Sequence, residues 1–317
     1  MISLVMSLYN GEKYIIEQLD SIKNQDRKID EVILLDDCST DNSYDIINEY
    51  IEKNELSHWR LTKNENNLGW RKSFRKVLSI AQGDVIFLCD QDDIWKTNKV
   101  SLMAEIMEHT PDIGLLSCGY TVFYDDTVEK ITGTLTNSMK NTGSIKKIDL
   151  DEKFMYIKRP GCTYAVRRTF YDRLETIWND EMAHDAILWR CAILQGKAYS
   201  VDKNLIYWRR HKGASSLKSS FISKENYRQD RIRYGIELST KRIEFLNAAL
   251  RWIQLYDNYS SDNIVKLLQK NKEFEKEHIK VFEQESLVQL IKVCIKYNKF
   301  YLSHRTQLGE FKLLLTK

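Results

Sequence analysis

Three carboxylates lie within four residues of the sequence: Asp90, Asp92 and Asp93. They follow the apolar run 85–88, which predicts a buried strand, so the acids emerge at its carboxyl end. Open α/β sheets bind their ligands at that end. Three anions this close repel one another unless a cation neutralises them, and oxygen ligands at this density suit Mg²⁺ or Mn²⁺. The alternative is a solvated acidic turn that caps a helix predicted over 96–108.

Two further groups of residues have types suited to chemistry. His184 and Asp185 precede an apolar helical run, so Asp185 lies at a helix start, where it is either a candidate general base or a cap. Arg209, Arg210 and His211 follow a predicted strand. Such a cluster can neutralise a diphosphate or complete a metal shell through an imidazole nitrogen. A solvated basic turn is the alternative.

The elements that must position these residues alternate along the chain. Apolar runs at 2–8 and 32–35 predict buried strands, and each is followed by a turn and a helical stripe. A third helix is predicted between Gly69 and Gly83, before the strand that leads into the acids. This alternation predicts an α/β protein with a doubly wound, mostly parallel sheet and right-handed crossovers.

The pattern changes near residue 220. Both prolines lie before residue 161, and the remainder of the chain is long, Pro-free and helical in pattern. We therefore expect a first domain over 1–220 and a helical C-terminal region over 221–317, whose role is membrane association, an oligomer contact or packing.

Several fragments occur in the order typical of one family. They are Ser7-Leu8-Tyr9-Asn10-Gly11, Asp36-Asp37-Cys38-Ser39-Thr40-Asp41, Asp90-Gln91-Asp92-Asp93-Ile94-Trp95, Pro160-Gly161-Cys162-Thr163, His184-Asp185 and Leu205-Ile206-Tyr207-Trp208-Arg209-Arg210-His211. Through them residues 1–216 resemble the family 2 inverting glycosyltransferases of the GT-A fold. Within that family the chain is similar to bacterial rhamnosyltransferases of cell-wall and capsule assembly. Each fragment alone is weakly specific, whereas together and in order they make a strong signal.

The resemblance implies roles for individual residues. Asp90 would hold the ribose of a nucleotide-diphosphate sugar, and Asp92 with Asp93 would coordinate the Mn²⁺ or Mg²⁺ that bridges its diphosphate. His211 would complete the metal shell, and Arg209 and Arg210 would neutralise the diphosphate. Asp185 would remove the proton from the acceptor hydroxyl as that oxygen attacks the anomeric carbon.

Three more residues would frame the nucleotide base: Ser7, Tyr9 and Asp36. A carboxylate can accept the imide N–H of uracil or thymine, and an aromatic ring beside it can stack on the base. The alternatives are a sheet-edge aromatic for Tyr9 and a helix cap for Asp36.

The function that we expect is metal-dependent, inverting transfer of a sugar to a saccharide or polyprenyl-linked acceptor in cell-surface polysaccharide synthesis. The resemblance favours L-rhamnose from dTDP-rhamnose as donor. The alternatives are a UDP-hexose or UDP-N-acetylhexosamine donor, or a non-catalytic scaffold that binds nucleotide sugars. Many rhamnosyltransferases have Asn three residues after the histidine of the basic cluster, where this chain has Ala214. This difference affects the prediction of the transferred sugar more than the prediction of the reaction type.

Composition limits the partners. The net charge of +3 is too small to indicate nucleic acid, and the six cysteines form no C-x-x-C pair that would indicate a zinc site. Without a basic and apolar leader or a run of about 18 apolar residues, we expect a cytoplasmic protein. From Phe221 onward 18 Lys and Arg stand against 12 Asp and Glu.

Within this basic region an apolar stripe lies beside Lys292, Lys296 and Lys299. It comprises Leu287, Leu290, Ile291, Cys294 and Ile295. Such a helix can lie on the anionic inner face of the plasma membrane. It can equally pack against the catalytic domain or a second copy in a homo-oligomer.

Overall fold

The computed structural model describes residues 1–125, 139–213, 227–255 and 261–315, and its contacts divide the chain into two units. Unit 1 comprises 1–149 and 157–212, and unit 2 comprises 150–156 and 213–317. The predicted boundary at 220 lies outside the described residues. Unit 2 also includes the short segment Leu150–Tyr156, and no feature of the sequence separates this segment from the first domain.

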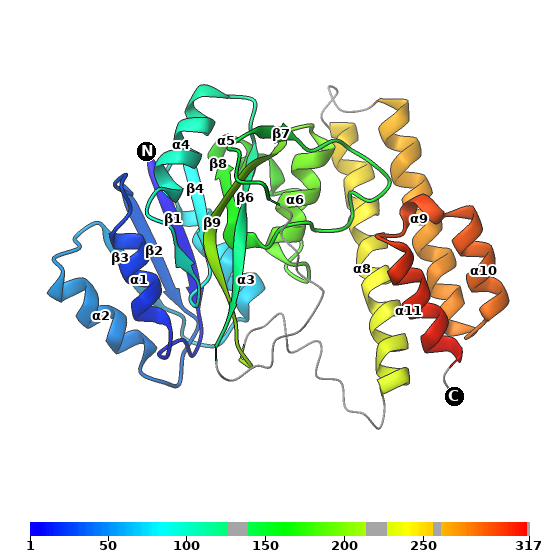
Figure 1. Cartoon of the computed structure of the whole chain (residues 1–317), viewed down its shortest axis with the longest axis horizontal. Coiled ribbons are helices and arrows are strands. Elements are labelled where there is room, and N and C mark those ends of the chain that lie inside the picture. Colours follow the sequence, from blue (N-terminus) through cyan, green and yellow to red (C-terminus); the bar gives the residue numbers. More distant parts are fainter. Residues whose placement is uncertain (126–138, 214–226, 256–260, 316–317) are drawn as a thin grey trace. The chain divides into compact units, whose positions relative to one another are not determined.

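Unit 1 is built on one sheet, which has nine strands within the described residues (Figure 1). The strand order is β3-β2-β1-β4-β8-β6-β9-β5, and β7 pairs with β9. The strands are β1 Ile2–Leu8, β2 Glu31–Asp36, β3 Trp59–Lys63, β4 Val85–Cys89, β5 Ile94–Trp95, β6 Leu115–Tyr124, β7 Ile145–Lys147, β8 Tyr164–Arg167 and β9 Ala198–Arg210. All residues of β2 and β4 are buried, as expected of strands covered on both faces.

The sheet is mostly parallel, as predicted. Strands β1 to β4 pair in parallel, and β6 pairs in parallel with β9. Strand β8 lies antiparallel between β4 and β6, and β5 and β7 are antiparallel to β9. Because β8 runs opposite to β4, the start of β8 lies beside the end of β4. The turn η1 Gly161–Thr163 is thereby brought next to the acidic loop.

The helices of unit 1 are α1 Ile15–Lys23, α2 Ser43–Lys53, α3 Trp70–Ile80, α4 Lys99–His109, α5 Arg168–Tyr171 with the turn η2 Asp172–Leu174, and α6 His184–Leu194. Helix α1 buries one stripe against the core, namely Ile15, Leu19 and Ile22. Helix α6 differs because every residue from Ala186 to Leu194 is buried. Helix α4 starts three residues later than predicted, since residues 94–95 form β5 and pair with β9.

Unit 2 is helical, as predicted for the C-terminal extension. Its described helices are α8 Tyr227–Leu255, α9 Asp262–Glu283, α10 Leu287–Lys296 and α11 His304–Leu315, with the turn η5 Asn298–Phe300. Phe274, Leu290 and Tyr297 belong to its apolar core, and Arg242 of α8 forms a buried ion pair with Glu275 of α9 at 3.1 Å. No helix among the described residues is long and apolar enough to cross a membrane.

Helix α10 divides the stripe seen in the sequence. Leu290 and Val293 are buried in the core of unit 2, whereas Ile291 and Ile295 are exposed together with Val288. One face of α10 therefore packs, and the other presents apolar side chains to solvent.

Candidate active site

The acidic loop leaves the carboxyl end of β4 and is held down by β9. Asp93 is completely buried, and its Oδ1 accepts a hydrogen bond from the backbone N–H of Arg209 at 3.0 Å. Asp90 and Asp92 are partly exposed. The loop thus buries the Asp93 side chain completely, whereas Asp90 and Asp92 each keep part of their surface exposed.

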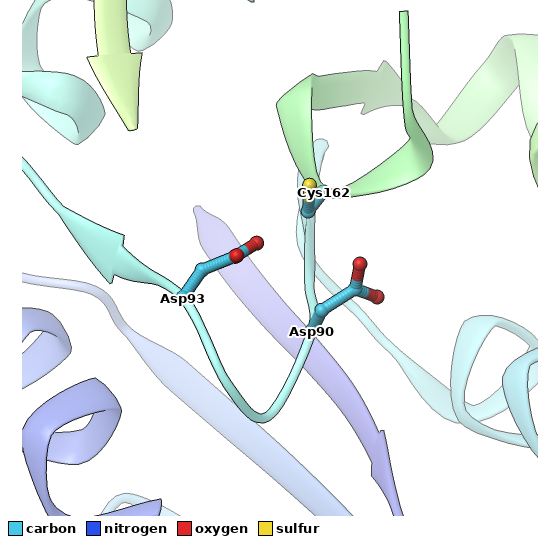
Figure 2. Close-up of side chains that lie close together, drawn as sticks. All are labelled: Asp90, Asp93 and Cys162. Atoms are coloured by element: carbon cyan, nitrogen blue, oxygen red, sulfur yellow. The ribbon is translucent and has the colours of Figure 1, made fainter. Parts of the chain in front are cut away.

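Cys162 faces the inward part of this loop. One ligand atom each of Asp90, Asp93 and Cys162 lies within 4.8 Å of the others, and Figure 2 shows the thiol on the turn opposite the two carboxyls. Burial raises the pKa of the Cys162 thiol well above its usual value, so the sulfur stays protonated. A neutral thiol is a poor ligand for a hard cation, so the carboxylates of Asp90 and Asp93 are the groups of this cluster that could bind one.

Burial also raises the pKa of the two acids. Asp90 reaches about 7, because burial and then the charges of Asp92 and Asp185 disfavour its ionised form. Burial raises the pKa of Asp93 as well, and the charges of Asp92 and Asp90 add to the effect. Acids in this state favour a cation that would neutralise them.

A buried lysine provides one positive charge near the cluster. Lys99 Nζ donates to the Cys162 carbonyl at 3.0 Å and lies 3.1 Å from the centre of the Trp95 ring. Its charge lowers the pKa of both Asp90 and Cys162, against the larger effect of burial. Lys99 is not among the site residues predicted from the sequence. The sequence does contain a clue to its burial, because Lys99 falls at the helical spacing of the buried residues of α4, which include Val100, Met103 and Met107.

Asp92 lies with the basic cluster. Its Oδ2 is 2.7 Å from His211 Nε2. The structure therefore separates the predicted metal ligands, with Asp92 beside His211 and Asp93 beside Asp90.

The two arginines of the cluster, which are predicted to neutralise the diphosphate, each make contacts within the protein. Arg209 pairs with Glu17 and donates from Nε to the Asp92 carbonyl at 2.8 Å. Its guanidinium also lies 4.6 Å from the Tyr14 ring centre. Arg209 therefore connects the acidic loop, through the Asp92 carbonyl, to Tyr14 and Glu17. The guanidinium of Arg210 lies 4.7 Å from the ring centre of Trp208.

Asp185 lies in the first turn of α6, but Ala183 occupies the N-cap position. Its Oδ1 is buried and has no hydrogen-bond partner within the described part of the chain. Burial raises the pKa of the Asp185 carboxyl, and Arg190 and Arg71 oppose the effect. A carboxylate with a raised pKa and an unused oxygen has the properties of a general base.

Gly161 lies in a turn between Asp185 and the acidic loop. A Cβ at Gly161 would lie 2.9 Å from His184 Nε2 and 3.1 Å from Asp185 Cβ, which explains why glycine stands at this position. The next residue is Cys162, beside Asp90 and Asp93. A single turn therefore contacts the candidate base on one side and the acidic cluster on the other.

The predicted nucleotide-binding residues lie where β1 and β2 end side by side. Leu8 pairs with Asp36, and Ser7 precedes Leu8 on β1. Asp36 is completely buried, its Oδ2 accepts from the Ser39 N–H at 3.0 Å, and its Oδ1 lacks a partner among the described residues. It is not the cap of α2, because Asn42 occupies that position. The unused oxygen suits an imide N–H.

Tyr9 follows β1 and is 42% exposed, as a stacking platform requires. Its backbone is clamped by Gln91, which accepts from the Tyr9 N–H at 2.8 Å and donates to the Tyr9 carbonyl at 3.1 Å. Gln91 ties the end of β1 to the acidic loop. Gln91 is not among the site residues predicted from the sequence, although it lies between Asp90 and Asp92.

Comparison with known proteins identifies the chain. The family described as Glycosyl transferase family 2 matches residues 3–173. The chain belongs to this family.

Curated relatives agree with the assignment. This family 2 glycosyltransferase is 25% identical over 265 residues to the putative teichuronic acid biosynthesis glycosyltransferase TuaG of Bacillus subtilis, covering 81% of this chain and 95% of TuaG. It is 27% identical over 250 residues to the poly(ribitol-phosphate) beta-N-acetylglucosaminyltransferase TarS of Staphylococcus aureus, covering 76% of this chain and 41% of TarS.

Solved structures support the fold. The crystal structure of S. aureus TarS 1-349 in complex with UDP-GlcNAc superimposes with a TM-score of 0.57 at 16% identity, over 89% of this chain and 91% of that one. The complex with UDP gives a TM-score of 0.56 at 17% identity, over 90% and 92%. The α/β unit with its helical extension thus has the GT-A fold.

Proposed function

We propose that this family 2 glycosyltransferase transfers a sugar with inversion from a nucleotide-diphosphate donor to a saccharide or polyprenyl-linked acceptor. The observation that carries the proposal is the buried Oδ1 of Asp185, which has no hydrogen-bond partner among the described residues and lies next to the turn that leads through Gly161 and Cys162 to the acidic loop. In the reaction the acceptor oxygen bonds to the anomeric carbon and gives its proton to Asp185. The bond from that carbon to the diphosphate breaks, and its electron pair leaves with the diphosphate.

The side chains present fit a divalent cation. Asp92 lies beside His211 and Asp93 lies beside Asp90, so Asp92, Asp93 and His211 would hold Mn²⁺ or Mg²⁺ once these two groups approach each other around the ion. Asp90 would hold the ribose, and the raised pKa of Asp90 and Asp93 supports a cation near them. When bound, the cation supplies positive charge to the departing diphosphate. Arg209, which donates to the Asp92 carbonyl, and Arg210 are proposed to neutralise the diphosphate.

The nucleotide base of the donor is proposed to be a pyrimidine with an imide N–H, held by Ser7, Tyr9 and Asp36. The Oδ1 of buried Asp36, which lacks a hydrogen-bond partner in the described part of the chain, supports this choice, because it would accept a hydrogen bond from the imide N–H of uracil or thymine. Exposed Tyr9 offers the ring on which such a base would stack.

dTDP-L-rhamnose, UDP-hexoses and UDP-N-acetylhexosamines all satisfy this base requirement, and two of these donors have specific support. The resemblance to rhamnosyltransferases favours dTDP-L-rhamnose, and the complexes of TarS with UDP and UDP-GlcNAc favour UDP-N-acetylglucosamine. The names of TuaG and TarS support an acceptor among cell-surface polymers such as teichuronic acid or poly(ribitol phosphate).

The decisive experiment compares both donors with the purified full chain in Mn²⁺ and in chelator. The acceptors are poly(ribitol phosphate), teichuronic acid and a polyprenyl-diphosphate-linked sugar, and the readouts are released nucleotide and glycosylated product. Mn²⁺-dependent product from either donor supports the proposal and selects the sugar. Donor binding without transfer to any acceptor would favour the non-catalytic scaffold, which needs no base.

We propose in addition that unit 2 docks on an anionic membrane surface through α10. Val288, Ile291 and Ile295 are exposed at a spacing that places them on one face of the helix. Lys292 and Lys296 on the same helix are also exposed. Apolar side chains beside lysines are complementary to lipid with negative headgroups, which would bring the enzyme to a polyprenyl-linked acceptor.

Flotation with phosphatidylglycerol vesicles at low salt tests this docking. We expect the protein to float, and Ile295→Ser to reduce flotation strongly, because Ile295 is 77% exposed on the docking face. Leu255→Ser is the matched control, since Leu255 is 69% exposed at the end of α8. Absence of flotation, or equal loss in both variants, would reject the docking surface.

A further inference from the structure

An exposed tryptophan stands at the start of α3. Trp70 is 38% exposed, and the loop before it is fixed by Asp37, whose carboxylate accepts from the Leu68 and Gly69 N–H groups at 2.8 Å each. Gly69 has a φ of +81°, a conformation that favours glycine. The chain therefore holds a large apolar ring at the surface on a rigid support.

The ring lies beside His184, the residue that precedes the candidate base. Its centre is 5.7 Å from that of His184 in an edge-on arrangement, and His184 immediately precedes Asp185. His184 itself is buried and stacked on Phe74 at 3.9 Å, so the position of Trp70 relative to α6 is well defined. An ion pair between Arg75 of α3 and Asp180, at 3.0 Å, also ties α3 to the segment before α6.

Arg71 provides a hydrogen-bond donor next to the Trp70 ring. Its guanidinium lies 4.6 Å from the centre of the Trp70 ring, and its charge lowers the pKa of Asp185. Its Nε is buried and has no partner within the described residues. A buried N–H that lacks an acceptor is costly, and a bound ligand oxygen would satisfy it.

We propose that Trp70 and Arg71 form the acceptor-sugar subsite of this enzyme. The apolar face of the sugar ring that carries the attacking hydroxyl stacks on the exposed indole, and Arg71 donates to one of its oxygens. The hydroxyl is thereby held next to Asp185. The inference rests on the proposed role of Asp185 as the base, and it names a saccharide as the acceptor group in contact with the protein.

Direct binding tests the subsite independently of catalysis. The protein labelled with 5-fluorotryptophan gives separate ¹⁹F resonances for its seven tryptophans, and Trp70→Phe identifies the signal of Trp70. Methyl glycosides of rhamnose, glucose, galactose and N-acetylglucosamine are titrated to about 0.1 M, enough to detect millimolar affinity. We expect at least one to shift the Trp70 resonance saturably, both in the native protein and in Asp185→Asn.

Kinetics test the consequence for transfer. With the same glycosides as acceptors, Trp70→Ala should raise the acceptor KM about tenfold or more, since truncation of a stacked tryptophan removes one of the strongest types of contact. The donor KM and the slow hydrolysis of donor without acceptor should not change, and Trp70→Phe should restore most of the affinity. Leu68→Ala is the control, because Leu68 is exposed in the same loop but carries no ring.

The outcomes separate this inference from the proposed function. If no glycoside moves the Trp70 resonance, or if Trp70→Ala impairs donor binding and acceptor binding alike, Trp70 merely covers His184 and the subsite is rejected. If glycosides bind at Trp70 while Asp185→Asn transfers sugar normally, the subsite stands and the role of the base falls. Where no glycoside accepts sugar, the ¹⁹F titration alone decides.

Discussion

Substitution of Gly161 by alanine isolates the turn that connects the two halves of the site. The added Cβ would lie 2.9 Å from His184 Nε2 and 3.1 Å from Asp185 Cβ. Ordinary contacts between such atoms are about 3.5 Å, so at least about half an ångström of movement is required. The His184 ring cannot easily give way, because it is buried and stacked on Phe74 at 3.9 Å.

Two effects follow from this crowding. Overpacking of a buried site typically costs about 1–3 kcal/mol of the free energy of unfolding. Displacement of Asp185 should be more damaging, since a misplacement of ~1 Å in a reacting group can reduce rates about 10²-fold. We therefore expect Gly161→Ala to lower transfer by roughly 10²-fold while the protein remains folded and binds donor.

The assay combines urea unfolding, calorimetric titration of the donor in Mn²⁺ and the rate of transfer. Gly309→Ala is the control, because Gly309 lies within α11 and a Cβ there would meet nothing within 4 Å. That variant should gain about 0.5–1 kcal/mol from the better helix propensity of alanine and transfer sugar normally. Normal transfer by Gly161→Ala would refute the contact between this turn and the base.

Three further predictions address the acids. Asp185→Asn should reduce transfer by about 10²–10⁴ with donor affinity nearly unchanged, because the amide cannot take a proton; normal transfer measured with matched donor and acceptor would return Asp185 to a structural role. Asp90 has a pKa of about 7 against its usual 3.8, so the folded, cation-free protein holds more protons than the unfolded chain in this window. The stability of the protein should therefore fall as pH rises from about 4 to 7, and Asp90→Asn should make that fall shallower in urea midpoints measured with chelator. An unchanged slope would contradict the raised pKa of Asp90. In unit 2, Glu275→Ala should cost about 3–5 kcal/mol in urea unfolding, since it leaves the Arg242 charge buried without its partner, and a loss under about 1 kcal/mol would show that the pair is not desolvated.

Long-range pairing explains what the sequence could not reveal about the site. Gln91 clamps the Tyr9 backbone from 82 residues away, and Lys99 donates to the Cys162 carbonyl from 63 residues away. No sequence pattern predicts either interaction, because a hydrogen bond between distant loops depends on which strands become neighbours in the sheet. The exposed face of α10 is a similar case, since only packing decided that Leu290 would be buried and Ile291 would not.

The sequence by itself determined the alternation of strands and helices, the helical C-terminal region and the position of the acids after β4. These features are local: buried strands require continuous apolar runs, and the residues after a parallel strand emerge at its carboxyl end. Only the tertiary structure decided that β8 lies antiparallel between β4 and β6. That one pairing sets Gly161 and Cys162 between Asp185 and the acidic loop, because an antiparallel neighbour begins where the parallel strand ends.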